Sequence, residues 1–270
     1  MENLKLNQYK EYLKPRPKAF FKGDAGHVLI VGGESGYSGA TILAAVSALR
    51  VGAGLVTLAT KVEHAAFLNA TRPEIMCRGI KDASELQPLF ERATVIVVGP
   101  GLGQTSWSIQ MLNAVLGQNK NLLVDADALN LIAKKPEKRN HWILTPHPGE
   151  AARLLKTSVE IIQNDRKAAA AKIQQEFGGV CVLKGSGTLV KGEGDISICE
   201  LGNPGMATAG MGDVLSGIIG GFLAQKIPLE PAAKMGVVVH AAAGDKASER
   251  GQRGMIASDL IEHLREFVNG

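Results

Sequence analysis

The chain has 270 residues, and its 45% hydrophobic content together with 32 glycines suits a compact globular enzyme with many tight turns. Its formal charge of +4 is too small to indicate nucleic-acid binding, and the 4% aromatic content argues against stacking platforms for single strands. Because the N-terminus lacks an apolar signal segment and no run of about 18 apolar residues occurs, we expect a soluble, cytoplasmic protein without membrane contact.

The first part of the chain predicts a β-α-β unit that follows a short arm. A Lys-rich helix or arm, a buried parallel strand, a Gly-rich turn, a helix and a second strand are expected at residues 1–23, 27–31, 32–39, 40–51 and 54–59. A dinucleotide-binding Rossmann unit has the same order of elements. However, Gly33, Gly36 and Gly39 do not follow the Gly-x-Gly-x-x-Gly spacing, and no carboxylate follows the second strand, so we discount that interpretation.

The rest of the chain continues the same pattern without a linker or an internal repeat. Further strands are predicted at residues 95–98, 122–124, 142–144 and 180–183, a hairpin at the sheet edge at 189–190 and 196–199, and closing helices at 213–225, 230–249 and 258–268. We therefore predict one domain over residues 1–270, with residues 1–23 as an N-terminal arm. The cysteines Cys77, Cys181 and Cys199 lack CxxC spacing, and buried free thiols are the expected state.

Residues 203–217 combine turn formers and small residues with the start of an apolar helix, and we expect the functional site there. Gly210 and Gly212 flank the entry to this helix, where N–H groups without intrahelical partners and the helix dipole favour a bound anion. Asp213 at this position predicts a base that takes a proton from a hydroxyl attacking a phosphoryl group. The alternative is that Asp213 only caps the helix, because Asp is a preferred N-cap residue.

Other polar residues fall just after predicted strands, at the sheet edge where open parallel sheets bind ligands. Lys184–Thr188 predicts either a phosphate or nucleotide cradle or a plain Gly-rich turn. His147 is either a site residue or a structural histidine. Glu150 either complements a helix dipole or anchors Mg²⁺ through water, while Asp125 and Asp127 are expected to cap the following turn. No Walker P-loop, HExxH or GxSxG motif occurs, which removes the basis for three common enzyme classes.

In this order the motifs resemble those of the NAD(P)H-hydrate dehydratases, a ribokinase-like family that repairs damaged nicotinamide cofactor. The segments that carry the resemblance are residues 32–40, 99–103, 125–129, 145–150, 184–188 and 203–217. They extend over most of the chain, and the last segment is highly specific. The resemblance implies a ribokinase-like α/β fold, a three-layer α/β/α sandwich with a mostly parallel central sheet.

The resemblance also implies a reaction. The substrate would be the (6S) hydrate of NADH or NADPH, with ADP or ATP as co-substrate and Mg²⁺ as cofactor. Asp213 would deprotonate the added hydroxyl, which would attack the terminal phosphoryl group, and phosphate would then leave. By motif position, the implied contacts are Ala40, Gly103, His147 and Asp213 for the hydrate, Lys184, Gly185, Ser186, Gly187, Thr188 and Gly212 for the nucleotide, Gly210, Met211 and Gly212 for the anion hole, and Glu150 for the metal.

One departure from related kinases is informative. Vitamin kinases of this fold usually carry Asn-x-x-Glu where this chain has His147-Pro148-Gly149-Glu150, and the histidine resembles the dehydratase branch. A thiazole or pyrimidine vitamin kinase is the alternative activity, and a catalytically inactive nucleotide sensor is a third possibility. Only about two dozen residues precede the first core strand, so we expect no fused hydrate epimerase domain. Family precedent favours a homo-oligomer such as a tetramer.

Overall fold

The centre of the molecule is a sheet of ten short strands, which the computed structural model describes over residues 1–269. The strands are β1 (Glu2–Asn3), β2 (His27–Val31), β3 (Leu55–Thr60), β4 (Met76–Gly79), β5 (Val95–Val98), β6 (Asn121–Val124), β7 (Trp142–Leu144), β8 (Val180–Leu183), β9 (Thr188–Lys191) and β10 (Ser197–Cys199). Strands β2, β5, β7 and β8 are buried along their whole length, because helices cover both faces of the sheet.

The strand order is β4-β3-β2-β5-β6-β7-β8-β9-β10-β1, and among these strands β9 alone runs antiparallel to its neighbours. The chain first builds outward from β2 through β3 to β4, and then returns to place β5 on the other side of β2. Val28 pairs with both Val56 and Val95 across this point. The carboxyl ends of β2 and β5 therefore form a topological switch point, where open α/β sheets bind ligands.

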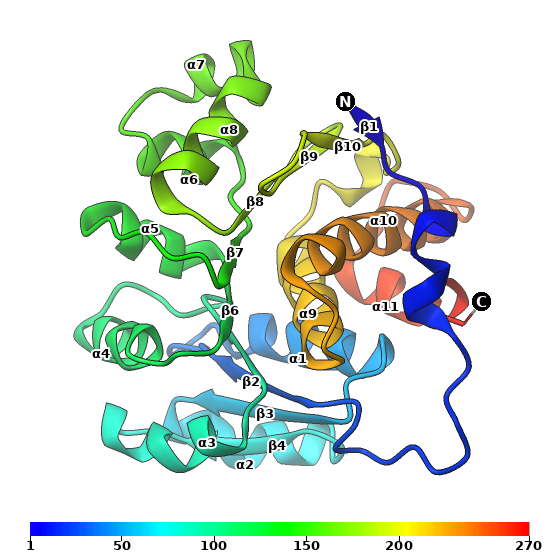
Figure 1. Cartoon of the computed structure of the whole chain (residues 1–270). Coiled ribbons are helices and arrows are strands. Elements are labelled where there is room, and N and C mark those ends of the chain that lie inside the picture. The colour runs from blue at the N-terminus through cyan, green and yellow to red at the C-terminus, as the bar shows by residue number, and fades with distance from the viewer. Residues whose placement is uncertain (270) are drawn as a thin grey trace.

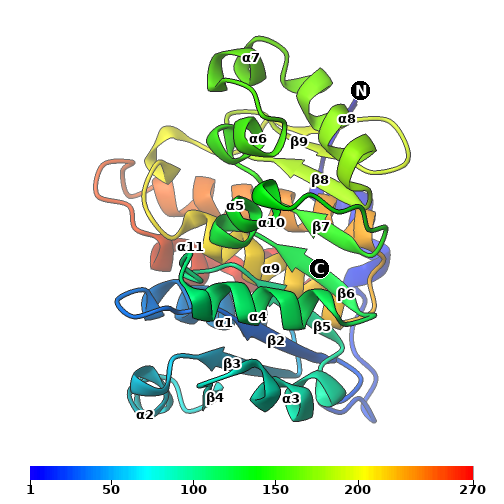
Figure 2. The same cartoon turned by 90° about the vertical axis from the view of Figure 1, so that its left-hand side faces the viewer.

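Helices form an outer layer on each face of the sheet (Figure 1). Apolar side chains of α1, α2, α9, α10 and α11 belong to one core cluster, and those of α3, α4, α5, α6, α7 and α8 belong to the other. Figure 2 looks onto the second face, where α4 and α5 lie in front of the strands. The helices and 3₁₀ turns are η1 (Leu6–Leu13), α1 (Ser38–Arg50), α2 (Val62–Thr71), η2 (Ala83–Leu86), α3 (Gln87–Arg92), α4 (Ser106–Leu116), α5 (Ala126–Lys134), α6 (Pro148–Leu154), α7 (Val159–Asn164), α8 (Arg166–Phe177), η3 (Pro204–Met206), α9 (Met211–Ala224), α10 (Leu229–Ser248) and α11 (Ala257–Phe267).

Helix α9 lies between the sheet, α1 and α10, which explains why its sequence is apolar on nearly every side. It approaches α1 closely at a glycine. A Cβ atom at Gly217 would lie 2.0 Å from the carbonyl oxygen of Ala44, so any larger residue would force the two helices apart. This contact fixes the start of α9, and with it Asp213, relative to the loop that follows β2.

The three-layer α/β/α fold and most of the expected elements are confirmed. The 189–199 hairpin forms, but the prediction that it is the sheet edge is wrong, because β1 pairs in parallel with β10. Helix α9 begins at Met211, earlier than expected. The cysteines are buried free thiols, as predicted. No helix in the described part of the chain is long and apolar enough to cross a membrane.

Candidate active site

The predicted site residues all lie near the carboxyl-terminal edge of the sheet. Ala40 and Gly103 follow β2 and β5, His147 and Glu150 follow β7, Lys184–Thr188 follows β8, and the entry to α9 faces the same edge. Five separate segments therefore meet at the sheet edge that the order of strands and turns predicted for them. Within residues 1–269 no hydrogen bond or ion pair joins Ala40 or Gly103 to Asp213.

The entry to α9 has the form expected of an anion site. Gly210 is the N-cap residue and adopts a left-handed conformation with φ of 90°, which favours glycine. The first helical hydrogen bond runs from the Val214 N–H to the Gly210 carbonyl oxygen at 3.0 Å. The N–H groups of Met211, Gly212 and Asp213 therefore lack intrahelical acceptors.

Asp213 is not the cap of this helix. It is the third residue of α9, and the cap is Gly210, without a side-chain hydrogen bond. Among residues 1–269 the Asp213 carboxylate has no hydrogen-bond or ion-pair partner. The alternative that Asp213 caps this helix is therefore wrong.

The environment of Asp213 suits proton transfer near neutral pH. Burial, followed by the charge of Asp125, raises the pKa of the Asp213 carboxyl to about 7, and the Lys184 ammonium opposes this rise. A carboxyl with a pKa near the working pH can both accept and release a proton readily. Such perturbed acids are concentrated at functional sites.

Lys184 links two acidic residues, Asp125 and Glu150, at the floor of this site. Its ammonium lies 2.8 Å from Asp125 Oδ1 and 3.8 Å from Glu150 Oε2. Burial lowers the pKa of Lys184, but Asp125 and Glu150 outweigh burial and raise it, so the side chain stays charged. A Cβ at Gly212 would lie 3.2 Å from Lys184 Nζ, so the glycine lets α9 begin directly beside this ammonium.

Asp125 does not have the capping role expected of it. It occupies the N-cap position of α5, but its side chain makes no capping bond. Instead Oδ1 accepts from Lys184 Nζ and Oδ2 accepts from the Ser216 hydroxyl at 2.7 Å. Burial raises the pKa of Asp125, yet Lys184 outweighs burial and holds it below its usual range. Ionised Asp125 is therefore drawn to Lys184 and to α9, which carries Ser216.

His147 and Glu150 form the capping box of α6. His147 Nδ1 accepts from the Gly149 N–H at 2.9 Å and the Glu150 N–H at 3.3 Å, while Glu150 Oε2 accepts from the His147 N–H at 2.8 Å. Burial lowers the pKa of His147, so the ring is neutral near pH 7. With Nδ1 accepting, the proton must lie on Nε2. His147 Nε2 lies 3.3 Å from Glu150 Oε1, and half of the His147 side chain is exposed.

A divalent cation fits this site only through water and phosphate. No group of three or more His, Cys, Asp or Glu side chains among residues 1–269 could hold a metal by itself. Glu150 is only 5% exposed, and burial raises its pKa to about 7. Mg²⁺ keeps several waters and commonly binds through one or two carboxylates plus substrate phosphates.

The Lys184–Thr188 loop borders a cavity of about 520 Å³. Its wall includes Lys184, Gly185, Ser186 and Thr188 of this loop together with Gly212 and His240. Burial lowers the pKa of His240 to about 4, so this ring is neutral. Its Nε2–H donates a hydrogen bond to the Met211 carbonyl oxygen at 2.9 Å. The predicted nucleotide loop and the α9 entry thus open onto one cavity.

Ala40 and Gly103 lie on neighbouring loops at the switch point. The Glu34 N–H donates to the Gly101 carbonyl oxygen at 2.7 Å, and a Cβ at Gly101 would lie 3.2 Å from the Ala40 Cβ. The Gly103 N–H already donates to Asp127 Oδ2 at 3.0 Å. Asp127 therefore supports the Gly103 loop, whereas capping of its own helix was expected. A ligand would meet Gly103 at its Cα or its carbonyl oxygen.

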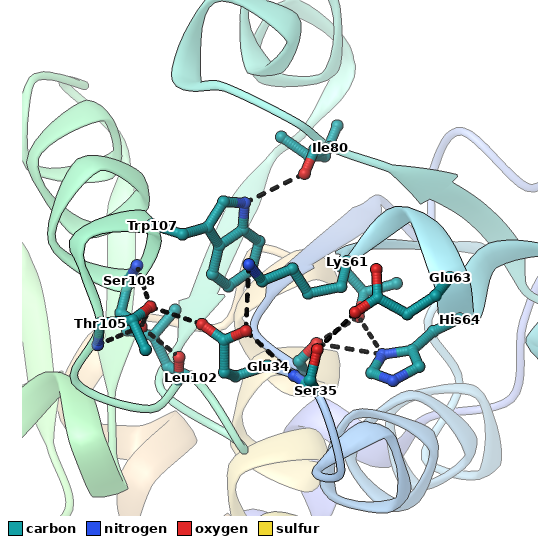
Figure 3. Close-up of polar contacts among 12 residues, drawn as sticks. Glu34, Ser35, Lys61, Glu63, His64, Ile80, Leu102, Thr105, Trp107 and Ser108 are labelled. Carbon is teal, nitrogen blue, oxygen red and sulfur yellow. Dashed lines mark hydrogen bonds and ion pairs between the residues drawn. The ribbon is translucent and has the colours of Figure 1, made fainter.

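A polar network around Glu34 ties these loops together (Figure 3). The buried Glu34 carboxylate accepts from Thr105 Oγ1 at 2.5 Å, from the Ser35 N–H at 3.1 Å and from Lys61 Nζ at 3.0 Å. Lys61 lies over the Trp107 ring, 4.9 Å from its centroid. Burial raises the pKa of Glu34, but these donors outweigh burial and lower it. The ionised carboxylate therefore braces the loops that follow β2 and β5.

Sequence reasoning missed Ser216 and Glu34. Ser216 had a usable signal, since it is a polar residue one helical turn after Asp213 in an otherwise apolar helix. Glu34 had none, because its partner Thr105 lies 71 residues away in the sequence.

Comparison with known proteins identifies the family of this chain. The statistical model of the family described as NAD(P)H-hydrate dehydratase matches residues 28–266. The chain belongs to this family. The bifunctional NAD(P)H-hydrate repair enzyme Nnr of Coxiella burnetii is 51% identical over 95% of this chain and 53% of its own length. The ADP-dependent (S)-NAD(P)H-hydrate dehydratase of Neisseria meningitidis is 40% identical over 97% of this chain and 91% of its own.

Solved structures of similar proteins share the fold. A ribokinase-like superfamily protein from Enterococcus faecalis superposes with a TM-score of 0.92 at 31% identity, covering 99% of this chain and 95% of its own. The ADP/ATP-dependent NAD(P)H-hydrate dehydratase of Bacillus subtilis, co-crystallised with ATP and Mg²⁺, gives 0.88 at 29% identity, covering 98% and 97%. The fold is thus ribokinase-like, as expected. The chain spans about half the length of the bifunctional family members it matches.

Proposed function

We propose that this protein dehydrates the (6S) hydrate of NADH or NADPH at the expense of ADP or ATP. The observation that carries the proposal is Asp213, a carboxyl with a pKa of about 7 set among unpaired N–H groups at the start of α9. Family membership and the ADP-dependent relative support the choice of substrates. The match to the dehydratase family also favours this activity over a vitamin kinase.

Asp213 would act on the hydroxyl that hydration adds to the ring. As the hydroxyl oxygen forms its bond to the terminal phosphorus of the nucleotide, the O–H proton passes to the Asp213 carboxylate and the bond to the nucleoside phosphate breaks. The ring nitrogen then supplies the electron pair that expels phosphate from the ring carbon. Loss of a proton from the adjacent carbon restores the dihydronicotinamide. Phosphorylation is useful here because phosphate is a far better leaving group than hydroxide.

Backbone and lysine charge would stabilise the phosphoryl group in transit. The N–H groups of Met211 and Gly212 point out of the start of α9, where the dipole also favours negative charge. Lys184 adds a fixed cation held beside Gly212 by Asp125. Gly210, with its positive φ, makes this turn possible. The anion hole is thus assigned to Gly210, Met211 and Gly212.

The remaining predicted contacts divide between the two substrates. Lys184, Gly185, Ser186, Gly187 and Thr188 with Gly212 are proposed to bind the nucleotide, and Ala40, Gly103 and His147 the hydrate. Bound Mg²⁺ would neutralise charge on the nucleotide phosphates, and Glu150 would hold it through water. ADP and ATP are both retained as co-substrates, since the relatives that support the proposal are described with either.

The cellular location and the oligomeric state of the protein are also part of the proposal. Reduced cofactor, its hydrate and adenine nucleotides are found inside cells, so the proposed activity fits a cytoplasmic protein. The buried free thiols Cys77, Cys181 and Cys199 suit a reducing compartment. A homo-oligomer such as a tetramer is expected from family precedent, and light scattering of the purified chain would measure it.

The test replaces the proposed base with its uncharged isostere. For Asp213→Asn we expect kcat to fall at least about a hundredfold, the usual contribution of a positioned general base. The assay follows NAD(P)H absorbance and free phosphate from authentic hydrate, with ADP and ATP compared side by side. Near-normal turnover would contradict the role given to Asp213.

The matched control is Asp24→Asn. Asp24 accepts a hydrogen bond from the Phe21 N–H just before β2, at the opposite edge of the sheet. This variant should keep wild-type turnover. A stable phosphomonoester, formed in place of NAD(P)H and phosphate, would instead identify a kinase.

A further inference from the structure

A single arginine holds the backbone of the proposed nucleotide loop. Arg166 is the first residue of α8 and reaches back to the turn between β8 and β9. Its Nη2 donates to the carbonyl oxygens of Leu183 at 3.1 Å and Lys184 at 3.2 Å. Its Nη1 donates to the carbonyl oxygens of Ser186 and Gly187, the latter at 3.0 Å. Four carbonyl groups of one short turn thus converge on one guanidinium group.

This arrangement fixes the direction of the amide groups in the same turn. In a planar trans peptide the C=O of one residue and the N–H of the next point in opposite directions. With the carbonyls of Lys184, Ser186 and Gly187 directed at Arg166, the N–H groups of Gly185, Gly187 and Thr188 must point away from it. Within residues 1–269 the N–H groups of Gly185 and Gly187 have no hydrogen-bond partner. Unpaired backbone N–H groups gathered in one turn form anion-binding concavities.

Four carbonyl oxygens require the several donors of an arginine, and the close approach of Arg166 leaves no room for a side chain at position 185. A guanidinium group offers its donors in a rigid planar fork, whereas a lysine offers a single point charge on a flexible stem. A Cβ at Gly185, which has φ of 142°, would lie 2.9 Å from Arg166 Nη2. Arg166 forms no ion pair with any carboxylate of residues 1–269, so it is not held there by a salt bridge. Its described partners are backbone carbonyl oxygens.

We propose that Arg166 is the positioning residue of the nucleotide site. By binding the carbonyls of the Leu183–Gly187 turn, it directs the Gly185 and Gly187 N–H groups toward the phosphates of a bound nucleoside diphosphate or triphosphate. Arg166 itself does not touch the nucleotide. Its positive charge also lies behind the turn and adds to the attraction for the phosphates. The inference rests on the proposed function, because it takes the cavity beside this loop as the nucleotide site.

The experiment compares Arg166→Ala and Arg166→Lys with the wild-type protein. ADP affinity is measured directly by calorimetric titration, and kcat and both KM values by the hydrate assay. We expect the Kd and the KM for ADP to rise about tenfold or more, the equivalent of one or two net hydrogen bonds, in both variants. The KM for the hydrate should stay within about twofold, because its proposed contacts lie on other loops. Addition of guanidinium ion at millimolar concentration should restore ADP binding to Arg166→Ala and not to Arg166→Lys, and urea should restore neither.

The control is Lys172→Ala on the same helix. Lys172 forms an exposed ion pair with Glu176 at 3.8 Å and lies away from the loop, so ADP binding should not change. An ADP Kd within about twofold of wild type in Arg166→Ala would overturn the proposal. So would an equal loss of affinity for ADP and hydrate without rescue by guanidinium, which is the pattern of general destabilisation.

The two proposals fail in different ways. A wild-type protein that binds ADP but does not dehydrate the hydrate contradicts the proposed function alone. A wild-type protein that dehydrates the hydrate, with ADP binding insensitive to Arg166→Ala, contradicts the positioning role alone. A wild-type protein that binds neither ADP nor ATP contradicts both.

Discussion

Residues of the same chemical type have different protonation behaviour in this site because their partners differ. Asp125 is wholly buried yet ionised, since Lys184 and Ser216 bind both of its oxygens. Asp213 and Glu150 lack so close a cation, and burial raises the pKa of each to about 7. Environments that push the pKa values of neighbouring acids apart are how one site obtains both a fixed charge and a proton acceptor.

The raised pKa of Asp213 predicts the pH dependence of catalysis. The base must be unprotonated, so kcat/KM for the hydrate should fall as the pH drops below about 7. With an ordinary aspartate pKa near 4, the fall would begin only at a much lower pH. The measurement is kcat/KM at saturating nucleotide between pH 5 and pH 9, with each buffer checked for folding by circular dichroism. The acid limb should weaken in the residual activity of Asp213→Asn, and the part that remains reports Glu150, whose pKa is also about 7. A wild-type profile that is flat down to about pH 5 would contradict the prediction.

At the scale of elements, the sequence predicts features that depend on neighbouring residues and does not predict those that depend on distant ones. Strands β5, β7 and β8 were located from sequence because each is a short, wholly apolar run between turn signals. Residues 61–94 carried no such signal, since β4 is a four-residue outer strand with exposed Met76 and Arg78, and α2 buries only Leu68. The site loops could be placed at one sheet edge from strand order. Their contacts with each other could not, because Glu34 and Thr105 are 71 residues apart.

Because α9 and α1 are in close contact at Gly217, we expect one added methyl group at this position to lower stability strongly. A Cβ at Gly217 would lie 2.0 Å from the Ala44 carbonyl oxygen, which cannot move without displacing α1. Gly217→Ala should therefore lower the free energy of unfolding by about 1–3 kcal/mol or more, as overpacking does, although alanine favours helix. Urea denaturation followed by circular dichroism measures this. Gly194→Ala is the control, because its Cβ would meet nothing closer than Glu230 Oε1 at 3.9 Å.

The same substitution connects stability with catalysis. Displacement of α9 would move Asp213 and the N–H groups at its start relative to Lys184. We therefore expect Gly217→Ala to lose kcat even at temperatures where it is fully folded. Unchanged stability in Gly217→Ala would mean that α1 and α9 adjust freely to one another.

On the scale of the whole molecule, the two core clusters lie on opposite faces of one sheet and share its strands. Leu123 and Ile143 point into one cluster, while Leu122 and Leu144 point into the other. The N-terminal arm belongs to this body as well, because Leu4 is buried and its N–H donates to the Ile198 carbonyl oxygen at 2.8 Å. The arm was expected from sequence, but its pairing was not. A two-residue strand gains its stability from a partner almost 200 residues away, and no local pattern encodes that partner.

This organisation predicts that residues 1–269 unfold as one unit. Leu4→Ala removes buried apolar volume from the arm and should lower the free energy of unfolding by about 2–5 kcal/mol. The chain has two tryptophans, and Trp107 and Trp142 both lie in the core cluster on the opposite face of the sheet from Leu4. In a cooperative domain, tryptophan fluorescence and far-ultraviolet circular dichroism should shift to the same lower urea midpoint. Phe21→Ala, at a side chain that is 63% exposed, should shift neither signal. If the arm were an independent appendage, Leu4→Ala would leave the tryptophan midpoint unchanged, and the single-domain prediction would fail.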